Sequence, residues 1–289
     1  MALDIEQLDK PIRKVRKILY KMPTEPSPDQ VHDLRTNSRR LEAVLEATDP
    51  DRNGRKILKQ ISKVRKKAGK VRDVDVLTAY ATELPHDGDE ESCSIRLLEH
   101  LGAVRQKNAK KLRKTAQQLA PDLRKRLKRV SQDLQNRVKQ RQADQSRTST
   151  RITSAALELV GELERPTSLN ETNLHPYRLK VKELRNLLRL AEAHGDESFL
   201  ETLCEVKDAI GEWHDWVELE AIAKKALDHD QCRLMRELKK KSRDRFERAL
   251  ALTDRMRGKY LRTSKNKASQ RRPPTSDESV WSATAALSA

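Results

Sequence analysis

Cysteine, glycine and aromatic side chains are all scarce in this chain of 289 residues. It holds three Cys, eight Gly, three Trp, four Tyr and two Phe. The glycines are scattered, so the sequence contains no phosphate-cradling glycine loop. So few aromatic rings offer little stacking surface to the bases of a single-stranded nucleic acid. Cys93, Cys204 and Cys232 lack the spacing of a metal or redox motif, and we expect them to be reduced and to behave as small apolar side chains.

Long uncharged apolar runs are also missing. No window approaches the roughly 18 uncharged apolar residues that a membrane-spanning helix needs. The segment 1–22 carries charges throughout, whereas a secretory signal has an apolar centre. We therefore expect no membrane partner and a cytoplasmic location.

Positive charge, by contrast, is in excess. The chain has 61 Lys and Arg against 44 Asp and Glu, which gives a formal net charge of +17. Such an excess indicates a polyanionic partner, which can be a nucleic acid, an anionic lipid or a phosphate polymer. The alternative is a highly charged helical protein without such a partner.

Aliphatic residues recur at helical spacing and predict an all-α fold of long amphipathic helices. The expected helices cover residues 3–21, 28–47, 54–83, 91–145, 149–164, 174–193, 197–228 and 230–261. Ser27 and Gln30 fit a capping box at the start of the second helix, and Pro121 should kink or break the fourth. Residues 262–289, which are rich in Ser, Thr and Pro, are expected to form a disordered tail.

Two blocks of sequence occur twice, in the same order. "VHDLRTNSRRLEAVLE" (31–46) returns as "LHPYRLKVKELRNLLR" (174–189), 143 residues later. "SKVRKKAGKVRDVDVL" (62–77) returns as "CEVKDAIGEWHDWVEL" (204–219), 142 residues later. Separate blocks with nearly equal offsets predict an internal repeat of two helical halves. The halves are expected at about residues 1–145 and 146–261.

Basic side chains form a stripe on the helix of the first block. At 100° per residue, His32, Arg35 and Arg39 share one narrow face. In the repeat, the same face carries His175, Arg178, Lys182 and Arg185. Both stripes begin in the first turns of their helices, where unpaired N–H groups and the helix macrodipole favour an anion such as phosphate.

A ridge of lysines follows on the next helix of the first half. Basic residues recur at spacings of three and four along about 20 Å of helix: Lys56, Lys59, Lys63, Lys66 or Lys67, and Lys70. Like charges at these spacings repel one another, so the ridge is easiest to explain if an anion lies along it. The alternative is a solvated face whose lysines extend into water. The matching stretch of the second half keeps only Lys207, so the two halves are electrically unequal.

No catalytic constellation is visible in the sequence, and we expect no enzymatic activity. The repeated acids Asp73, Asp75 and Asp215 do not form the cluster that metal-assisted hydrolysis needs, and we expect them to pair with basic residues or to cap a helix. His32 and His175 are of a type that can ligate metals, but we expect them to donate to phosphate or to a carboxylate. No metal and no cofactor are therefore expected.

The paired motifs carry a family resemblance. "VHDLRTNSRR" with "GKVRDVDVL", and "LHPYRLKVKELR" with "GEWHDWVEL", resemble the CHAD family, the conserved-histidine α-helical domain, over about residues 5–261. The resemblance implies one domain of two antiparallel four-helix bundles, related by a pseudo-twofold axis, with a basic groove or pore between them. It also implies binding of inorganic polyphosphate, often at polyphosphate granules, without catalysis by the domain itself.

The resemblance also assigns residues to this binding. It implies contacts with polyphosphate at His32, Arg35, Arg39, Arg40, Arg65, Arg72, His175, Arg178, Lys182, Lys207 and His214. Two positions depart from the family pattern. His214 stands where members more often have Arg or Asn, and Pro176, which directly follows His175, fits only the first turn of a helix.

The leading hypothesis is a non-catalytic module that binds inorganic polyphosphate through Lys, Arg and His side chains of both halves and is located at polyphosphate granules. A helical nucleic-acid-binding protein is the second choice, because it would need the same charge and would show the same dependence on salt. An enzyme or regulator of polyphosphate metabolism and a structural adaptor are further alternatives.

Overall fold

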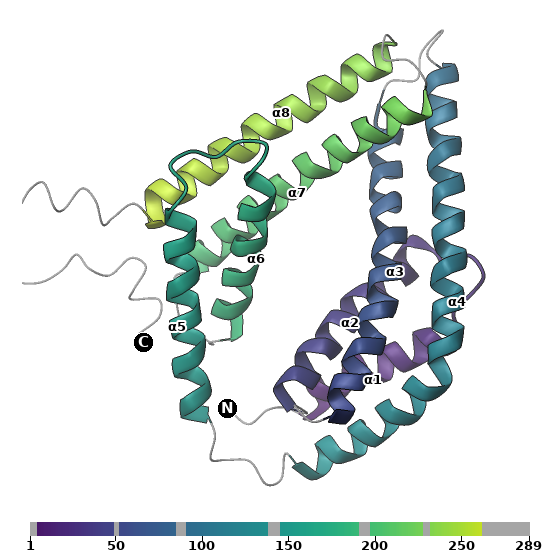
Figure 1. The fold of residues 1–289 in the computed structure, drawn as a ribbon, viewed down its shortest axis with the longest axis vertical. Helices are drawn as coiled ribbons and strands as arrows, with labels where there is room; N and C mark the ends of the chain where they lie inside the picture. Colours follow the sequence, from purple (N-terminus) through teal and green to yellow (C-terminus); the bar gives the residue numbers. More distant parts are fainter. Residues whose placement is uncertain are drawn as a thin grey trace, which may run out of the picture. The chain divides into compact units, whose positions relative to one another are not determined.

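The computed structural model describes residues 5–48, 52–84, 91–137, 145–190, 197–227 and 232–261. These residues form helices and no strands, so the predicted all-α fold is confirmed. The elements are α1 (Ile5–Tyr20), α2 (Pro28–Thr48), α3 (Arg52–Thr82), α4 (Glu91–Arg137), α5 (Gln145–Glu164), α6 (Leu174–Leu190), α7 (Glu197–Ala226), α8 (Arg233–Met256) and the π-helical turn η2 (Arg257–Leu261) (Figure 1). Among the described residues, no helix is both long and apolar enough to cross a membrane. The predicted tail, 262–289, lies outside the described residues.

The described helices belong to two compact units. Unit 1 contains α1–α4, and unit 2 contains α5–α8 with η2, apart from the last residue of α7. Each unit has a hydrophobic core of its own. The pseudo-twofold relation between the two halves stays a prediction.

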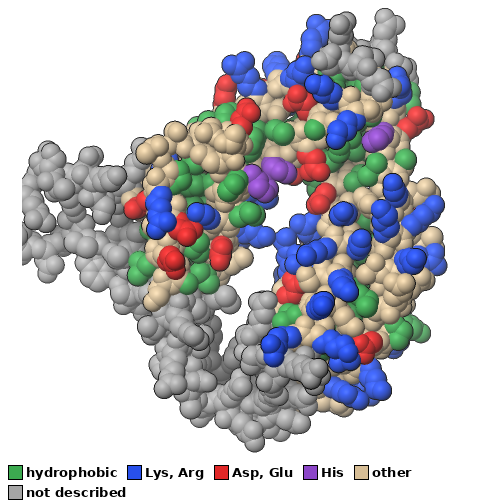
Figure 2. All heavy atoms as spheres, in the orientation of Figure 1, with side chains coloured by type: hydrophobic (Ala, Val, Ile, Leu, Met, Phe, Trp, Pro, Cys, Tyr) green, Lys and Arg blue, Asp and Glu red, His purple; other side chains and the backbone are tan. Residues whose placement is uncertain are grey.

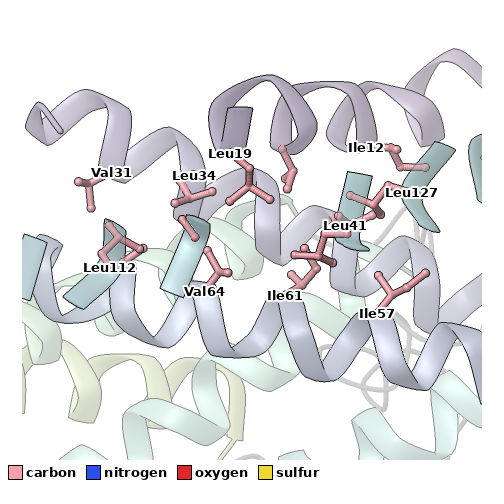
Figure 3. Packing of buried hydrophobic residues seen from close by; sticks show 14 of the residues in the cluster. Ile12, Leu19, Val31, Leu34, Leu41, Ile57, Ile61, Val64, Leu112 and Leu127 are labelled. Atoms are coloured by element: carbon pink, nitrogen blue, oxygen red, sulfur yellow. The ribbon is translucent and has the colours of Figure 1, made fainter. Parts of the chain in front are cut away.

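The core of unit 1 consists of aliphatic side chains from all four of its helices (Figure 3). The helices contribute Ile12, Val15 and Leu19 from α1, Val31, Leu34, Leu41 and Leu45 from α2, Ile57, Ile61, Val64, Ala68 and Val71 from α3, and Leu112, Leu123 and Leu127 from α4. On each helix these residues recur at spacings close to three and four, so they share one face and leave the charged residues on the other. The described part of this core holds no aromatic side chain, which fits the low aromatic content of the chain.

The core of unit 2 is different, because it gathers most of the aromatic rings of the chain. Tyr177, Phe199, Trp213 and Tyr260 are buried in it among aliphatic side chains. The rings of Phe199 and Tyr260 have centroids 4.6 Å apart, and those of Trp213 and Phe246 are 5.3 Å apart. These rings therefore serve packing and are not displayed as a stacking platform for bases.

The helices that carry the two stripes begin with reciprocal caps. Ser27 Oγ accepts from the Gln30 N–H at 3.2 Å, and Gln30 Oε1 accepts from the Ser27 N–H at 3.0 Å, so the predicted capping box is confirmed. Before α6, Asn170 and Asn173 exchange the same pair of bonds, at 3.3 and 2.8 Å. Pro176 consequently falls in the first turn of α6, where a backbone N–H would have no acceptor within the helix and its absence in proline costs no hydrogen bond.

Pro121 bends the fourth helix without ending it. α4 runs as one helix from Glu91 to Arg137 with Pro121 inside it, and Figure 1 shows that it changes direction along its length. A proline removes one backbone hydrogen bond and crowds the carbonyl four residues earlier, and a long helix packed on its neighbours absorbs this as a bend. Of the two alternatives that the sequence predicted for Pro121, the structure therefore shows a bend in α4 and not a break.

A buried ion pair joins three segments of unit 1. Arg105 of α4 donates through Nε to Asp75 Oδ1 of α3 at 2.6 Å and through Nη2 to the carbonyl oxygen of Pro26 at 2.8 Å. The Asp75 side chain is 3% exposed and that of Arg105 is 25% exposed. Because Pro26 directly precedes the Ser27 cap, this arginine fixes the start of α2 beside α3.

Unequal burial of the two partners predicts unequal effects of removing them. Arg105→Met should lower the free energy of unfolding by about 3 kcal/mol, because it leaves the carboxylate of Asp75 buried without its partner. Asp75→Asn should cost about 1–2 kcal/mol, because the amide still accepts from an arginine that reaches water. Urea denaturation of both variants measures the two losses. An equal or larger loss for Asp75→Asn would contradict this assignment.

Candidate functional site

The predicted stripe of unit 1 lies on the outer face of α2. His32, Arg39 and Arg40 are exposed and Arg35 is half-buried, whereas Leu34 between them faces the core. The Nε2 atom of His32 lies 3.4 Å from the hydroxyl of Thr36, one turn further along the helix. α2 thus presents the imidazole of His32 to solvent near its capped N-terminus and the guanidinium groups of Arg39 and Arg40 further along the helix.

Arg35 connects the stripe to α3. Its Nη1 atom donates to Asp73 Oδ1 at 3.0 Å, as expected for an acid that orients a basic residue. The same Nη1 lies 3.5 Å from the point that a Cβ atom on Gly69 would occupy. The side chains of Arg35 and Asp73 are 28% and 53% exposed, so this pair adds little stability. The pair instead holds the guanidinium of Arg35 in place. Because only one carboxylate binds this guanidinium, further N–H donors stay available for an anion.

The lysine ridge lies beside this stripe and is fully displayed to solvent. Its members, Lys56, Lys59, Lys63, Lys66 and Lys70, are all exposed on α3. Among the described residues, no hydrogen bond or ion pair engages any of the five amines. Figure 2 shows many Lys and Arg side chains on the visible face of α3 and α4. Apart from Lys56, whose charge interacts with Asp122, the ridge is therefore a row of like charges that the described residues leave uncompensated.

Two other predicted contacts of unit 1 are placed differently. Arg65 donates through Nε to both oxygens of Glu42 on α2, at 2.7 and 3.0 Å, and both side chains are mostly covered. This pair holds α3 against α2, so the charge of Arg65 is already balanced. Arg72 is half-buried at the end of the ridge. The repeat did not indicate Glu42 as a partner, because the equivalent position in the second half holds Arg185, which cannot form an ion pair with Lys207.

Unit 2 repeats the contact between arginine and glycine. Arg178 of α6 donates through Nε to the carbonyl oxygen of Lys207 on α7 at 3.0 Å. Its guanidinium lies across Gly211, so closely that an added Cβ would come within 2.5 Å of Nη2. Arg178 and Gly211 are the repeat equivalents of Arg35 and Gly69. The two sequence blocks therefore meet in each unit, and the glycine makes room for the arginine.

Two histidines from different blocks meet in unit 2. The rings of His175 and His214 have centroids 4.3 Å apart and are tilted by 37°. Burial, followed by the positive charges of His214 and Arg178, lowers the pKa of His175 below its ordinary value. The Nδ1 atom of His175 is buried and has no hydrogen-bond partner among the described residues. Sequence alone did not indicate this contact, because the two positions lie 39 residues apart on separate helices.

The other predicted contacts of unit 2 are less exposed than those of unit 1. Lys182 and Arg185 are half-buried, and Arg185 Nε has no hydrogen-bond partner among the described residues. The Lys207 amine pairs with Asp208, the next residue. The ridge has no counterpart, because the positions equivalent to its last three lysines hold acids: Glu205, Asp208 and Glu212. The structure thus brings the basic residues of unit 1 together on an open surface, and those of unit 2 mostly not.

The different clearances at the two glycines predict opposite effects of the same substitution. Gly69→Ala should raise the free energy of unfolding by up to about 1 kcal/mol, because alanine favours the helix and the contact at 3.5 Å is ordinary. Gly211→Ala should lower it, because Arg178 must leave its bond to Lys207, a loss of about 1.5 kcal/mol or more.

Urea denaturation of both alanine variants, and of Gly211→Ala combined with Arg178→Ala, checks this explanation. In the double variant the alanine should no longer destabilise relative to Arg178→Ala alone. A Gly211→Ala variant as stable as Gly69→Ala would show that Arg178 does not need the space.

Comparisons with known proteins agree with this arrangement. The family model of the CHAD domain matches residues 12–224. A solved structure, the crystal structure of the CHAD domain from the plant Ricinus communis, is similar with a TM-score of 0.59 and 19% sequence identity, over 89% of this chain and 93% of that one. None of the curated proteins compared with the chain matches it. Since the family model spans the motif blocks of both halves, the chain belongs to the CHAD domain family.

Proposed function

We propose that this protein binds inorganic polyphosphate without catalysis, chiefly on unit 1. The observation that carries the proposal is the lysine ridge of α3, whose five amines are exposed and form no hydrogen bond or ion pair among the described residues, with only Lys56 near an acid, Asp122. Such a row costs stability through mutual repulsion. A linear polyanion laid along it would remove the repulsion and release counterions, which favours binding at low salt.

The chemistry of the neighbouring side chains supports a phosphate ligand. Lysine amines act as point charges and tolerate a polymer in many registers, whereas a guanidinium binds two phosphate oxygens at once in a fixed geometry. Arg35 is held in place by Asp73, and Arg39 and Arg40 follow it on α2. The ridge would therefore supply most of the attraction, and the stripe would orient individual phosphate groups.

The carboxylates beside this surface support binding rather than catalysis. Asp73 pairs with Arg35, Asp75 with Arg105, and Glu42 with Arg65. Acids engaged in this way orient basic side chains and hold helices together. On this proposal the protein recruits or retains polyphosphate, and polyphosphate granules are where it would be located.

The ridge predicts that removing its charges weakens binding more than removing the same number elsewhere. A Lys59→Gln/Lys63→Gln/Lys66→Gln variant should bind long-chain polyphosphate about 10- to 100-fold more weakly at about 0.1 M salt. Its plot of log affinity against log salt should also flatten by about two, because each lost phosphate contact removes roughly 0.7–0.9 from the slope. Fluorescence titration at several salt concentrations measures both quantities.

A matched control separates a specific surface from general attraction to a basic protein. Lys239→Gln/Lys240→Gln/Lys241→Gln on α8 removes the same charge from unit 2 and should change the affinity less than threefold. Equal losses in the two triple variants would overturn the assignment to the ridge. Duplex and single-stranded DNA used as competitors should fail to displace polyphosphate, and efficient displacement would favour nucleic acid as the ligand.

A further inference from the structure

One face of α7 gathers three side chains of metal-ligand type. His214, Asp215 and Glu218 each offer a ligand atom, and these atoms all lie within 4.8 Å of one another. At 100° per residue the three positions fall within an arc of about 100°, and His214 and Glu218 stand one turn apart. Trp216, about 150° from the middle of this arc, is buried. The helix backbone therefore aligns the three groups on its less buried side.

We propose that α7 binds one divalent transition-metal ion, best fitted by Zn²⁺, through His214, Asp215 and Glu218. An imidazole nitrogen with two carboxylate oxygens is a donor set that suits Zn²⁺ and related ions better than Mg²⁺ or Ca²⁺. Tetrahedral ligands about 2.0–2.1 Å from zinc lie about 3.4 Å from each other, so ligand atoms that are up to 4.8 Å apart need to approach one another by up to about 1.4 Å. Glu218 is exposed and can make this adjustment by changing rotamer.

The ring of His175 lies against His214 and favours its role as a ligand. The ring of His175 packs against His214 with centroids 4.3 Å apart, which restricts the orientation of the proposed ligand. Asp215 takes part in another interaction within the described residues. The Asp215 carboxylate can make this interaction and still bind a metal ion, because it has two oxygens and about four acceptor sites.

The comparison between the repeats points to a cation independently of the geometry. In the first half, the positions equivalent to His214, Asp215 and Glu218 hold Arg72, Asp73 and Val76. Unit 1 thus has a permanent positive charge and no third ligand at this place. Unit 2 has an imidazole in place of that arginine and a carboxylate in place of the valine. A bound divalent ion would restore the positive charge that the arginine supplies in unit 1.

The proposed ion would also join unit 2 to the polymer, a step that rests on the proposed polyphosphate binding. Three protein ligands leave at least one coordination position for water or for an anion. A phosphate oxygen of a bound chain can take that position. On α7 the acids that stand in place of the lysines are largely paired, Asp208 with Lys207 and Glu212 with Arg245 and Arg248, so this region lacks the excess positive charge of the ridge and a bound cation would supply it.

Metal binding is tested first, without polyphosphate, because polyphosphate itself captures divalent ions. The full chain, stripped of metal, is titrated with Zn²⁺ by calorimetry and with Co²⁺ by visible absorption. We expect a single tight site with the absorption of four- or five-coordinate Co²⁺. His214→Ala and Glu218→Gln should each weaken binding at least tenfold, whereas Glu201→Gln on the same helix should not. Equal affinities in wild type and both ligand variants would overturn the proposal.

A second measurement distinguishes this inference from the proposed function. Affinity for polyphosphate is compared between metal-free and Zn²⁺-loaded protein, in wild type and in Glu218→Gln. A several-fold gain on loading, absent in Glu218→Gln, supports the bridging role, and no gain overturns that role while leaving the metal site intact. If polyphosphate binds neither form, the proposed function fails, and the Co²⁺ titration still decides the metal site.

Discussion

An arginine guanidinium that lies across a helical glycine links the two sequence blocks in each unit. Arg35 crosses Gly69 in unit 1, and Arg178 crosses Gly211 in unit 2. A half-buried guanidinium needs polar partners, which are Asp73 in the first case and a backbone carbonyl in the second. The glycine provides the space that brings the arginine against the next helix. This constraint explains why the histidine–arginine block and the glycine block occur together and why their separation is nearly the same in both halves.

Sequence patterns within one or two helical turns predicted the positions of the helices, but they did not predict which side chains meet between helices. Aliphatic residues three and four apart placed every described helix, and Ser27 with Gln30 marked the start of α2, because both signals act within one or two turns. The exposure of the lysine ridge followed from the same periodicity. The pairing of Arg65 with Glu42, and the contact between His175 and His214, depend on how two helices pack, which no spacing within one helix encodes.

The use of each cation depends on whether a carboxylate reaches it. In unit 1, Arg65 and Arg105 face neighbouring helices and pair with the carboxylates of Glu42 and Asp75. These pairs hold the helices together. The lysines of α3 are exposed, and among the described residues only Lys56 lies close enough to an acid, Asp122, for their charges to interact. Charge number alone would assign both groups to ligand binding. Their packing separates a scaffold of arginines from a surface of lysines, and the surface is the part that an anion can use.

The two halves differ in the way their side chains balance charge. Where α3 carries Lys63, Lys66 and Lys70, α7 carries acids, and where α3 packs Val71, α7 packs Trp213 into an aromatic core. Unit 2 therefore has acids in place of three exposed lysines, and aromatic rings in a core that is aliphatic in unit 1. The cluster of His214 with two carboxylates makes sense in this setting, because its attraction for an anion would depend on a bound cation. One half would then hold polyphosphate at all times, and the other only when the metal is available.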